Sequence, residues 1–327
     1  MREKLIRAEV AAEANSAAHF ASDVQYYLTL QPRQLPSRYF YDALGSALFD
    51  AICRLPWYRI TRAETRLLDG CGEAILAHVP RLTTIVELGP GSGQKLATLV
   101  KAGRGRSARL DLHLIDVSPS ALEVSSRALS ALDEVHVVTH LAPYEVGLAE
   151  VTRERHRSGQ TLAIFLGSNI GNFDRPGTDA FLHGIRAALA AQDVFLIGAD
   201  LVKPERELLL AYDDPLGVTA AFNRNLLVRI NRELGGDFDV EAFAHRAIWN
   251  APESRVEMHL VSRRRQRVRV EAATLEFMME EGESIWTESS YKYLPADLVV
   301  MLERAGFRLA EQWIESQDGF ALTLAQA

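Results

Sequence analysis

The chain has few cysteines: only Cys53 and Cys71 occur among its 327 residues. Two cysteines cannot build a disulfide framework, and without spaced partner residues they do not indicate a zinc site. We therefore expect no bound metal, and the reducing cytoplasm is the simplest location for the protein.

The sequence also lacks a long apolar run at its start. The segment 1-MREKLIRAEVAAEANSA-17 carries acidic residues and has no apolar core. It is therefore interpreted neither as a signal peptide nor as a membrane span. No internal repeat or low-complexity tract is visible.

An excess of positive charge is missing as well. The formal net charge is −7 and the isoelectric point is about 5.8, which argues against nucleic acid or an anionic membrane as a partner. One basic run, 263-RRRQRVR-269, alternates within a strand-like segment and is interpreted as the solvated face of a hairpin.

Apolar runs that alternate with helical segments dominate the middle of the chain. Such runs are typical of strands buried on both faces, and their alternation with helices predicts a parallel, doubly wound sheet. A capping box, 61-TRAE-64, is expected to open one helix, and Ser118 with Pro119 another. The expected strands are 83–89, 110–117, 135–141, 161–168 and 193–201.

This alternation is interrupted after Leu201. Two helices are expected over 203–250, and 255–262 with 267–278 is expected to form a β-hairpin. A helix at 295–305 and two closing strands then resume the pattern. We therefore expect an α/β domain (61–201 and 293–327) and a second α+β lobe (1–60 and 202–292).

The first expected strand ends in a glycine loop, 87-ELGPGSGQK-95, and Asp116 ends the next strand. An acid about 20 residues beyond such a loop suits the ribose of a nucleotide-type cofactor. The spacing G-x-G-x-G differs from the G-x-G-x-x-G of dinucleotide-binding proteins. It resembles the first motif of class I S-adenosylmethionine (SAM) methyltransferases, whose sheet ends in an antiparallel strand. A strand–helix turn without a ligand, or a nicotinamide-dependent oxidoreductase, remains the alternative.

A second loop, 165-FLGSNIGNF-173, places two glycines and two asparagines after an apolar strand. Together with 39-YFYDALGSALFDAICRLPWYRITRAE-64, 255-RVEM-258 and 287-TESSYKY-293, it resembles the L-histidine Nα-methyltransferases of ergothioneine biosynthesis. The segment 212-YDDPLGVTAAFNRNLLVRINRELGGDF-238 shares this resemblance, which therefore extends over most of the chain.

The resemblance implies a histidine substrate and three successive methylations, which give hercynine. Asn172 and Tyr212 would hold its α-amino acid end, and Gly167 would line the site. Taken alone, Asn172 is equally consistent with an Asx-turn, and Tyr212 is better explained as a core tyrosine. Gly167 and Gly171 are expected to leave room for the added methyl groups, and Tyr41 is expected to orient the amine beside Asn172.

For the imidazole, the resemblance implies Glu288 and Ser290, which lie on one side of an extended segment, with Ser289 between them. Tyr58 and Met258 would line the same pocket. The alternative is a surface glutamate followed by turn serines, with Met258 as plain core filling.

For SAM, the resemblance implies one set of residues around the glycine loop. The family usually has an acidic residue where this chain has Pro143, so the contact to adenine is expected from Tyr144 or from the backbone. The implied cofactor residues are Gly89, Gly91, Lys95, Asp116 and Tyr144.

Two rival functions follow from the same residues. Relatives act on the α-amine of a tryptophan derivative, but an indole has no ring acceptor to match a Glu–Ser pair. A non-catalytic SAM-binding protein is the other. We expect a cytoplasmic monomer that binds small molecules, and neither nucleic acid nor membrane.

Overall fold

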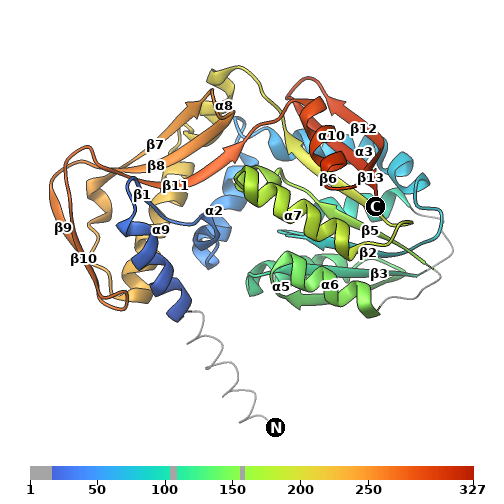
Figure 1. Cartoon of the computed structure of the whole chain (residues 1–327), viewed down its shortest axis with the longest axis horizontal. Helices are drawn as coiled ribbons and strands as arrows, with labels where there is room; N and C mark the ends of the chain where they lie inside the picture. Colours follow the sequence, from blue (N-terminus) through green and yellow to red (C-terminus); the bar gives the residue numbers. More distant parts are fainter. Residues whose placement is uncertain (1–16, 104–108, 155–158) are drawn as a thin grey trace, which may run out of the picture. The chain divides into compact units, whose positions relative to one another are not determined.

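The computed structural model describes residues 17–103, 109–154 and 159–327 (Figure 1). The chain divides into two compact units. The first unit contains the chain up to Trp57 together with Glu205–Asn250 and Val256–Ser289. The second contains Tyr58–Pro204, Ala251–Arg255 and Ser290–Ala327. Tyr58 and Ser290, which were expected in the smaller lobe, thus belong to the unit that carries the large sheet.

The second unit is built on a seven-stranded sheet with the order β12-β13-β6-β5-β2-β3-β4. Strands from β4 to β6 in this order are parallel, and β13 is antiparallel to both β6 and β12. The predicted doubly wound sheet with an antiparallel C-terminal strand is therefore confirmed. The strands are β2 (Leu82–Leu88), β3 (Leu110–Asp116), β4 (Val135–Leu141), β5 (Gln160–Phe165), β6 (Val194–Asp200), β12 (Arg308–Glu315) and β13 (Phe320–Gln326).

Helices cover both faces of this sheet (Figure 1). On one face lie α3 (Ile60–Ala77), α4 (Gln94–Ala102) and α5 (Pro119–Leu129). On the other, α6 (Tyr144–Glu154), α7 (Arg175–Ala188) and α10 (Pro295–Arg304) enclose an apolar cluster. All residues of β5 and β6 are buried, which explains their continuous apolar runs.

The start of α3 differs from the prediction. The helix begins at Ile60, and its N-cap residue, Arg59, provides no side-chain cap. Thr61 therefore lies inside the helix, and Glu64 is completely buried instead of reaching back to the helix end. The predicted capping box is wrong. Ser118, in contrast, caps α5 as expected, because its hydroxyl accepts a hydrogen bond from the Ala121 N–H.

The first unit contains a four-stranded sheet of order β1-β11-β8-β7 and a separate two-stranded sheet, β9 and β10. Its strands are β1 (Arg33–Gln34), β7 (Phe243–Asn250), β8 (Arg255–Ser262), β9 (Gln266–Val270), β10 (Leu275–Met279) and β11 (Ser284–Tyr291). Its helices are 17–29, η1 (Ser37–Phe40), α2 (Ala43–Arg54), α8 (Glu205–Tyr212), α9 (Val218–Leu234) and η3 (Val240–Ala242).

The predicted hairpin is wrong in its partners. β9 pairs with β10, while β8 lies between β11 and β7. The run 267–278 reads as one strand because its turn contains no glycine, proline or asparagine; Thr274 takes the left-handed conformation there, with φ 47°. The basic run does lie on an exposed face, where Arg265 and Arg267 pair with Glu280 and Glu276 of β10.

Candidate active site

The glycine loop after β2 meets two other loops at the carboxyl edge of the large sheet. Gly89 has φ 74°, in the left-handed region that favours glycine. A side chain there would lie 3.0 Å from Tyr144 Oη and 3.2 Å from Asn169 Nδ2. Gly91 is exposed. Since Tyr144 follows β4 and Asn169 follows β5, three strand ends converge where open α/β sheets bind ligands.

Glu87, at the end of β2, is the most unusual acid of this edge. Its carboxyl group is buried, and Oε2 has no hydrogen-bond partner within the described residues. Burial raises the pKa of Glu87 to about 8, against the attraction of Lys95 and with repulsion from Glu64 and Asp116. A buried acid without a partner marks a place where a ligand can donate a hydrogen bond or bring positive charge.

Asp116 ends β3, next to this loop. Its carboxylate accepts a hydrogen bond from the Ser118 N–H at 2.8 Å. Burial nevertheless raises the pKa of Asp116 above its usual value. Tyr144 packs edge-on against Phe165 and Phe181, so its ring belongs to the core beneath the glycine loop.

Glu64 is the residue of this edge that the sequence analysis missed as a site residue. It reaches from α3 to the loops after β2 and β5, and its side chain is fully buried. Its carboxylate accepts the Gly167 N–H at 2.8 and 2.9 Å and lies 2.5 Å from Lys95 Nζ. Glu64 therefore ties the glycine-loop helix α4 to the asparagine-containing loop.

The loop after β5 is held on both sides. Ser168, with φ 60°, accepts a hydrogen bond from the Asp200 N–H at 2.9 Å. A side chain at Gly171 would lie 2.7 Å from the Tyr291 carbonyl oxygen. The loop ends in η2 (Asn169–Asn172), where the Asn172 side chain is half-buried.

These contacts correct the expectation that Gly167 and Gly171 leave room for methyl groups. The side that lacks a Cβ faces Lys95 Nζ at 3.0 Å in Gly167 and the Tyr291 backbone in Gly171. Both glycines therefore allow protein groups to approach closely. The local sequence of the loop predicts neither the contact of Gly167 with Lys95 nor that of Gly171 with Tyr291.

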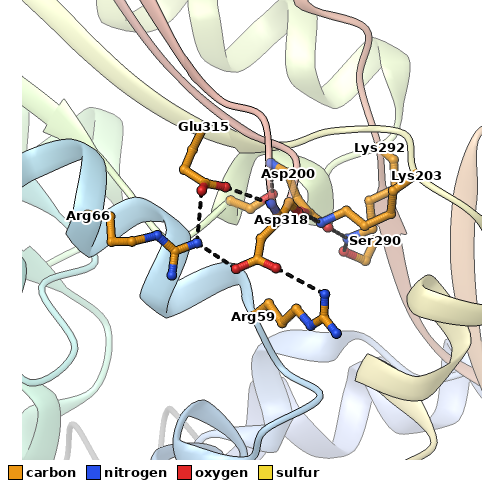
Figure 2. A network of polar contacts seen from close by, with 9 residues as sticks. Arg59, Arg66, Asp200, Lys203, Ser290, Lys292, Glu315 and Asp318 are labelled. Carbon is orange, nitrogen blue, oxygen red and sulfur yellow. Dashed lines mark hydrogen bonds and ion pairs between the residues drawn. The ribbon is translucent and has the colours of Figure 1, made fainter.

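Ser290 belongs to a buried polar cluster shown in Figure 2. Its hydroxyl accepts a hydrogen bond from Lys292 Nζ at 2.9 Å, and the same ammonium lies 2.9 Å from Asp200 Oδ2. The second carboxylate oxygen of Asp200 binds Lys203 Nζ at 2.6 Å. All of these side chains except Lys203 are more than nine-tenths buried.

The same cluster continues toward α3 (Figure 2). Lys203 also donates to the Asp318 carbonyl at 2.5 Å, and the Asp318 carboxylate binds Arg59 and Arg66. Burial opposes ionisation of Asp318, but these two guanidinium groups hold its pKa below the usual value. Ion pairs and one hydrogen bond to a backbone carbonyl thus connect the start of α3 to the end of β6.

The remaining predicted residues belong to the first unit, apart from Tyr58, which is buried in the second. Tyr41 is half-buried and makes edge contacts with Phe49 and Phe222 at centroid distances of 5.7 and 5.8 Å. Met258 is buried. Glu288 and Ser289 are half-buried on β11.

A buried relay in the first unit connects four of its elements, β11, α9, β7 and α8. Thr287 Oγ1 donates to Asn223 Oδ1 at 2.8 Å, and the Asn223 amide lies 2.9 Å from His245 Nδ1. His245 Nε2 lies 2.7 Å from the Tyr212 carbonyl oxygen. Burial lowers the pKa of His245, which favours a neutral ring that donates to Tyr212. The relay holds Thr287, which precedes Glu288, and Tyr212 at the end of α8. Its partners lie far apart in the sequence, so their contacts could not be predicted from it.

Among the described residues, no group of three or more His, Cys, Asp or Glu side chains is arranged to hold a metal ion. Within the same residues, no helix is both long enough and apolar enough to cross a membrane.

The strand order, the glycine loop after β2 and the acid that ends β3 define a class I SAM-dependent methyltransferase. The unpartnered Glu87 oxygen and the open glycine loop fit this cationic cofactor. The family model of histidine-specific, SAM-dependent methyltransferases matches residues 20–327. The chain therefore belongs to that family.

Several individual proteins are similar to this chain. A histidine N-alpha-methyltransferase of Mycobacterium tuberculosis is 42% identical, over 94% of this chain and 96% of its own. Ergothioneine biosynthesis protein 1 of Neurospora crassa is 28% identical, over 78% of this chain and 31% of its own. A solved SAM-dependent methyltransferase of Clostridium acetobutylicum has a TM-score of 0.41 at 10% identity, over 96% of this chain and 98% of its own.

Proposed function

We propose that this enzyme transfers three methyl groups in succession from SAM to the α-amino nitrogen of L-histidine. The product is hercynine, and the reaction is the first step of ergothioneine biosynthesis. Membership of the histidine-specific family supports the substrate. The names of the M. tuberculosis and N. crassa relatives support the position of methylation and the pathway.

One contact carries the proposal. Within the second unit, Gly171 packs against the backbone of Tyr291. This contact brings the loop that ends in Asn172 against the strand end that contains Ser290. The proposal assigns the α-amino acid end of histidine to the first segment and the ring to the second, so the two must be neighbours.

At the α-amino acid end, Asn172 and Tyr212 would bind the amine and the carboxylate, with Gly167 lining the site. An asparagine amide suits a zwitterion because it both donates and accepts hydrogen bonds. At the other end, Glu288, Ser289 and Ser290 would bind the imidazole, and Tyr58 and Met258 would pack around it. Glu288 accepts from one ring nitrogen in this arrangement.

SAM supplies a methyl group bound to a positively charged sulfur. The residues proposed to hold it are Gly89, Gly91, Lys95, Asp116 and Tyr144. The Glu64 carboxylate balances Lys95, and a cation bound beside Glu87 would favour the ionised form of that acid. The protein mainly has to align the amine with the methyl group at about 3–3.5 Å.

The amine must be unprotonated to accept the methyl group. An α-amino group has a pKa of about 7.7–8.0, and a nearby cation and loss of water both lower it. We propose that Tyr41 orients this amine and does not remove its proton, because a phenol is too weak a base to do so at neutral pH. The enzyme is proposed to act in the cytoplasm as a monomer with small-molecule partners.

Incubation of the enzyme with SAM and each amino acid, followed by mass spectrometry, tests the proposal. We expect products carrying one, two and three methyl groups from histidine alone, with all methyl groups on the α-nitrogen by NMR. Faster methylation of tryptophan, or methyl groups on the ring, would contradict it. Calorimetry with SAM and NAD then separates a methyltransferase from an oxidoreductase, since only SAM should bind.

A further inference from the structure

Asn169 is a polar residue at the carboxyl edge of the large sheet to which the proposed reaction gives no role. It is the first residue of η2, three positions before Asn172, and it is half-buried. Within the part of the chain that the structure describes, its side-chain nitrogen donates no hydrogen bond to a protein group. An amide nitrogen has two N–H donors, so Asn169 can donate to a ligand without giving up a contact of its own.

The side chain of Asn169 lies between the two loops of the site. A Cβ atom at Gly89 would lie 3.2 Å from Asn169 Nδ2, so the donor end of the amide faces the glycine loop. A Cβ atom at Gly167 would lie 3.7 Å from Asn169 Oδ1 and 3.0 Å from Lys95 Nζ. Because both glycines lack a side chain, the amide can approach the glycine loop on one side and the neighbourhood of Lys95 on the other.

The charges around this amide show which group of a cofactor needs it. SAM has an amino-acid end with a carboxylate, and Lys95 is the one cation among the residues proposed to hold SAM. The Lys95 ammonium already pairs with the Glu64 carboxylate at 2.5 Å. The buried Glu87 carboxyl group, also near Lys95, offers a second anion no attraction. A cofactor carboxylate beside Lys95 therefore needs a further donor, and Asn169 Nδ2 is one.

We propose that Asn169 is a further cofactor-binding residue, whose side-chain amide donates a hydrogen bond to the carboxylate at the amino-acid end of SAM. The inference rests on the proposed function, in which Gly89 and Lys95 hold SAM. Residues three apart in a 3₁₀-helix lie on the same side of it, so Asn169 and Asn172 share one side of η2. The first amide then binds the methyl donor and the second binds histidine, and this single turn sets the distance between the two ligands.

The alternative is that water alone contacts this amide and that Asn169 serves only the turn. Calorimetry separates the two, with histidine binding measured in the presence of saturating S-adenosylhomocysteine. We expect Asn169→Ala to weaken SAM binding about ten-fold, the loss of one hydrogen bond to a charged group, and to change histidine affinity less than about three-fold. Asn172→Ala is the matched control, because it removes the same amide three residues further on. It should weaken histidine binding and leave SAM binding within about three-fold of the wild type.

A change in the ligand identifies the group that Asn169 contacts. S-adenosylhomocysteine has the amino-acid end, whereas 5′-methylthioadenosine lacks it and keeps the ribose and the adenine. Asn169→Ala should weaken the binding of the first about ten-fold and that of the second less than about two-fold, because only the first presents a carboxylate. Asn169→Asp keeps the shape of the side chain but replaces the donor by a negative charge. It should weaken S-adenosylhomocysteine binding more than Asn169→Ala does, since like charges repel.

Melting curves provide a second readout. Since the Asn169 amide nitrogen donates no hydrogen bond within the described protein, Asn169→Ala should melt like the wild type without ligand and gain less Tm from S-adenosylhomocysteine. Should Asn169→Ala fail to fold, Asn169→Asp carries the same comparison.

The outcomes separate the inference from the proposed function. If the wild type binds no SAM, the proposed function is wrong. If the wild type binds SAM and Asn169→Ala binds it equally well, the role of Asn169 is overturned. An equal loss for 5′-methylthioadenosine, or an Asn169→Asp variant that binds S-adenosylhomocysteine as tightly as the wild type, also overturns it. If only Asn172→Ala fails to change histidine binding, the histidine site is wrong and the role of Asn169 stands.

Discussion

Replacement of Glu64 by glutamine tests whether this buried acid joins the two loops of the site. In the wild type its carboxylate accepts the Gly167 N–H at 2.8 and 2.9 Å and pairs with Lys95 at 2.5 Å. The amide of glutamine keeps one acceptor for the N–H but loses the charge that holds Lys95. The variant therefore removes an ion pair and leaves the packing volume unchanged.

The expected loss of stability follows from the burial of the pair. Breaking a fully buried ion pair costs about 3–5 kcal/mol, and a hydrogen bond to a charged group about 1.5–3 kcal/mol. The Lys95 side chain is 24% exposed, so water compensates part of its charge. We therefore expect Glu64→Gln to lose about 2 kcal/mol, which lowers Tm by about 4–8 °C for a domain of this size class.

Differential scanning fluorimetry measures this change, with Glu73→Gln as the control on the same helix. Glu73 is exposed, so its replacement should stay within about 0.5 kcal/mol of the wild type. Glu64→Gln should also weaken SAM binding about ten-fold, because Lys95 loses the charge that holds it. A Tm and a SAM affinity equal to those of Glu73→Gln would refute the reasoning.

Three further predictions address other parts of the site. Glu87 has its pKa raised to about 8, so the folded state keeps a proton that the unfolded state loses, and stability falls as pH rises from about 4.5 to 8. Glu87→Gln should remove this loss in melting curves recorded across that range; an unchanged pH slope contradicts the assignment. Gly171→Ala would place a Cβ 2.7 Å from the Tyr291 carbonyl oxygen. It should lower kcat/KM for histidine at least ten-fold and leave the affinity for SAM unchanged. Gly70→Ala is the control and should not change kcat/KM, because a Cβ at Gly70 would meet no other atom within 4 Å. Glu288→Ala should weaken histidine binding far more than SAM binding in calorimetry, and equal affinities for histidine would exclude it from the ring site.

The large sheet could be predicted because its strands are buried on both faces. Such strands read as continuous apolar runs, and the polar residues that end them mark the carboxyl edge of the sheet. Asp116 was found this way, since it ends an apolar run. The prediction needed no contact between distant residues.

The contacts of Glu64 could not be predicted, because a local sequence pattern suggested another role for this residue. The letters T-x-x-E match a capping box, which needs only neighbouring residues. The actual partner of Glu64 in the loop after β5 is 103 residues away. The same holds for Gly171, whose contact with Tyr291 has no counterpart in the sequence of either segment.

The charges of the second unit suggest why these distant contacts are needed. Around the glycine loop, the pKa of Glu87 is raised mainly by burial, and the charges of Glu64 and Asp116 add to this effect while Lys95 opposes it. Around Ser290, cations predominate: Lys292 and Lys203 share one carboxylate, Asp200. We propose that the first of these environments stabilises the cationic methyl donor. Glu64 contacts Gly167 at the start of the loop that ends in Asn172, and Tyr291 contacts Gly171 near its end. These two contacts hold the loop between both groups of charged residues.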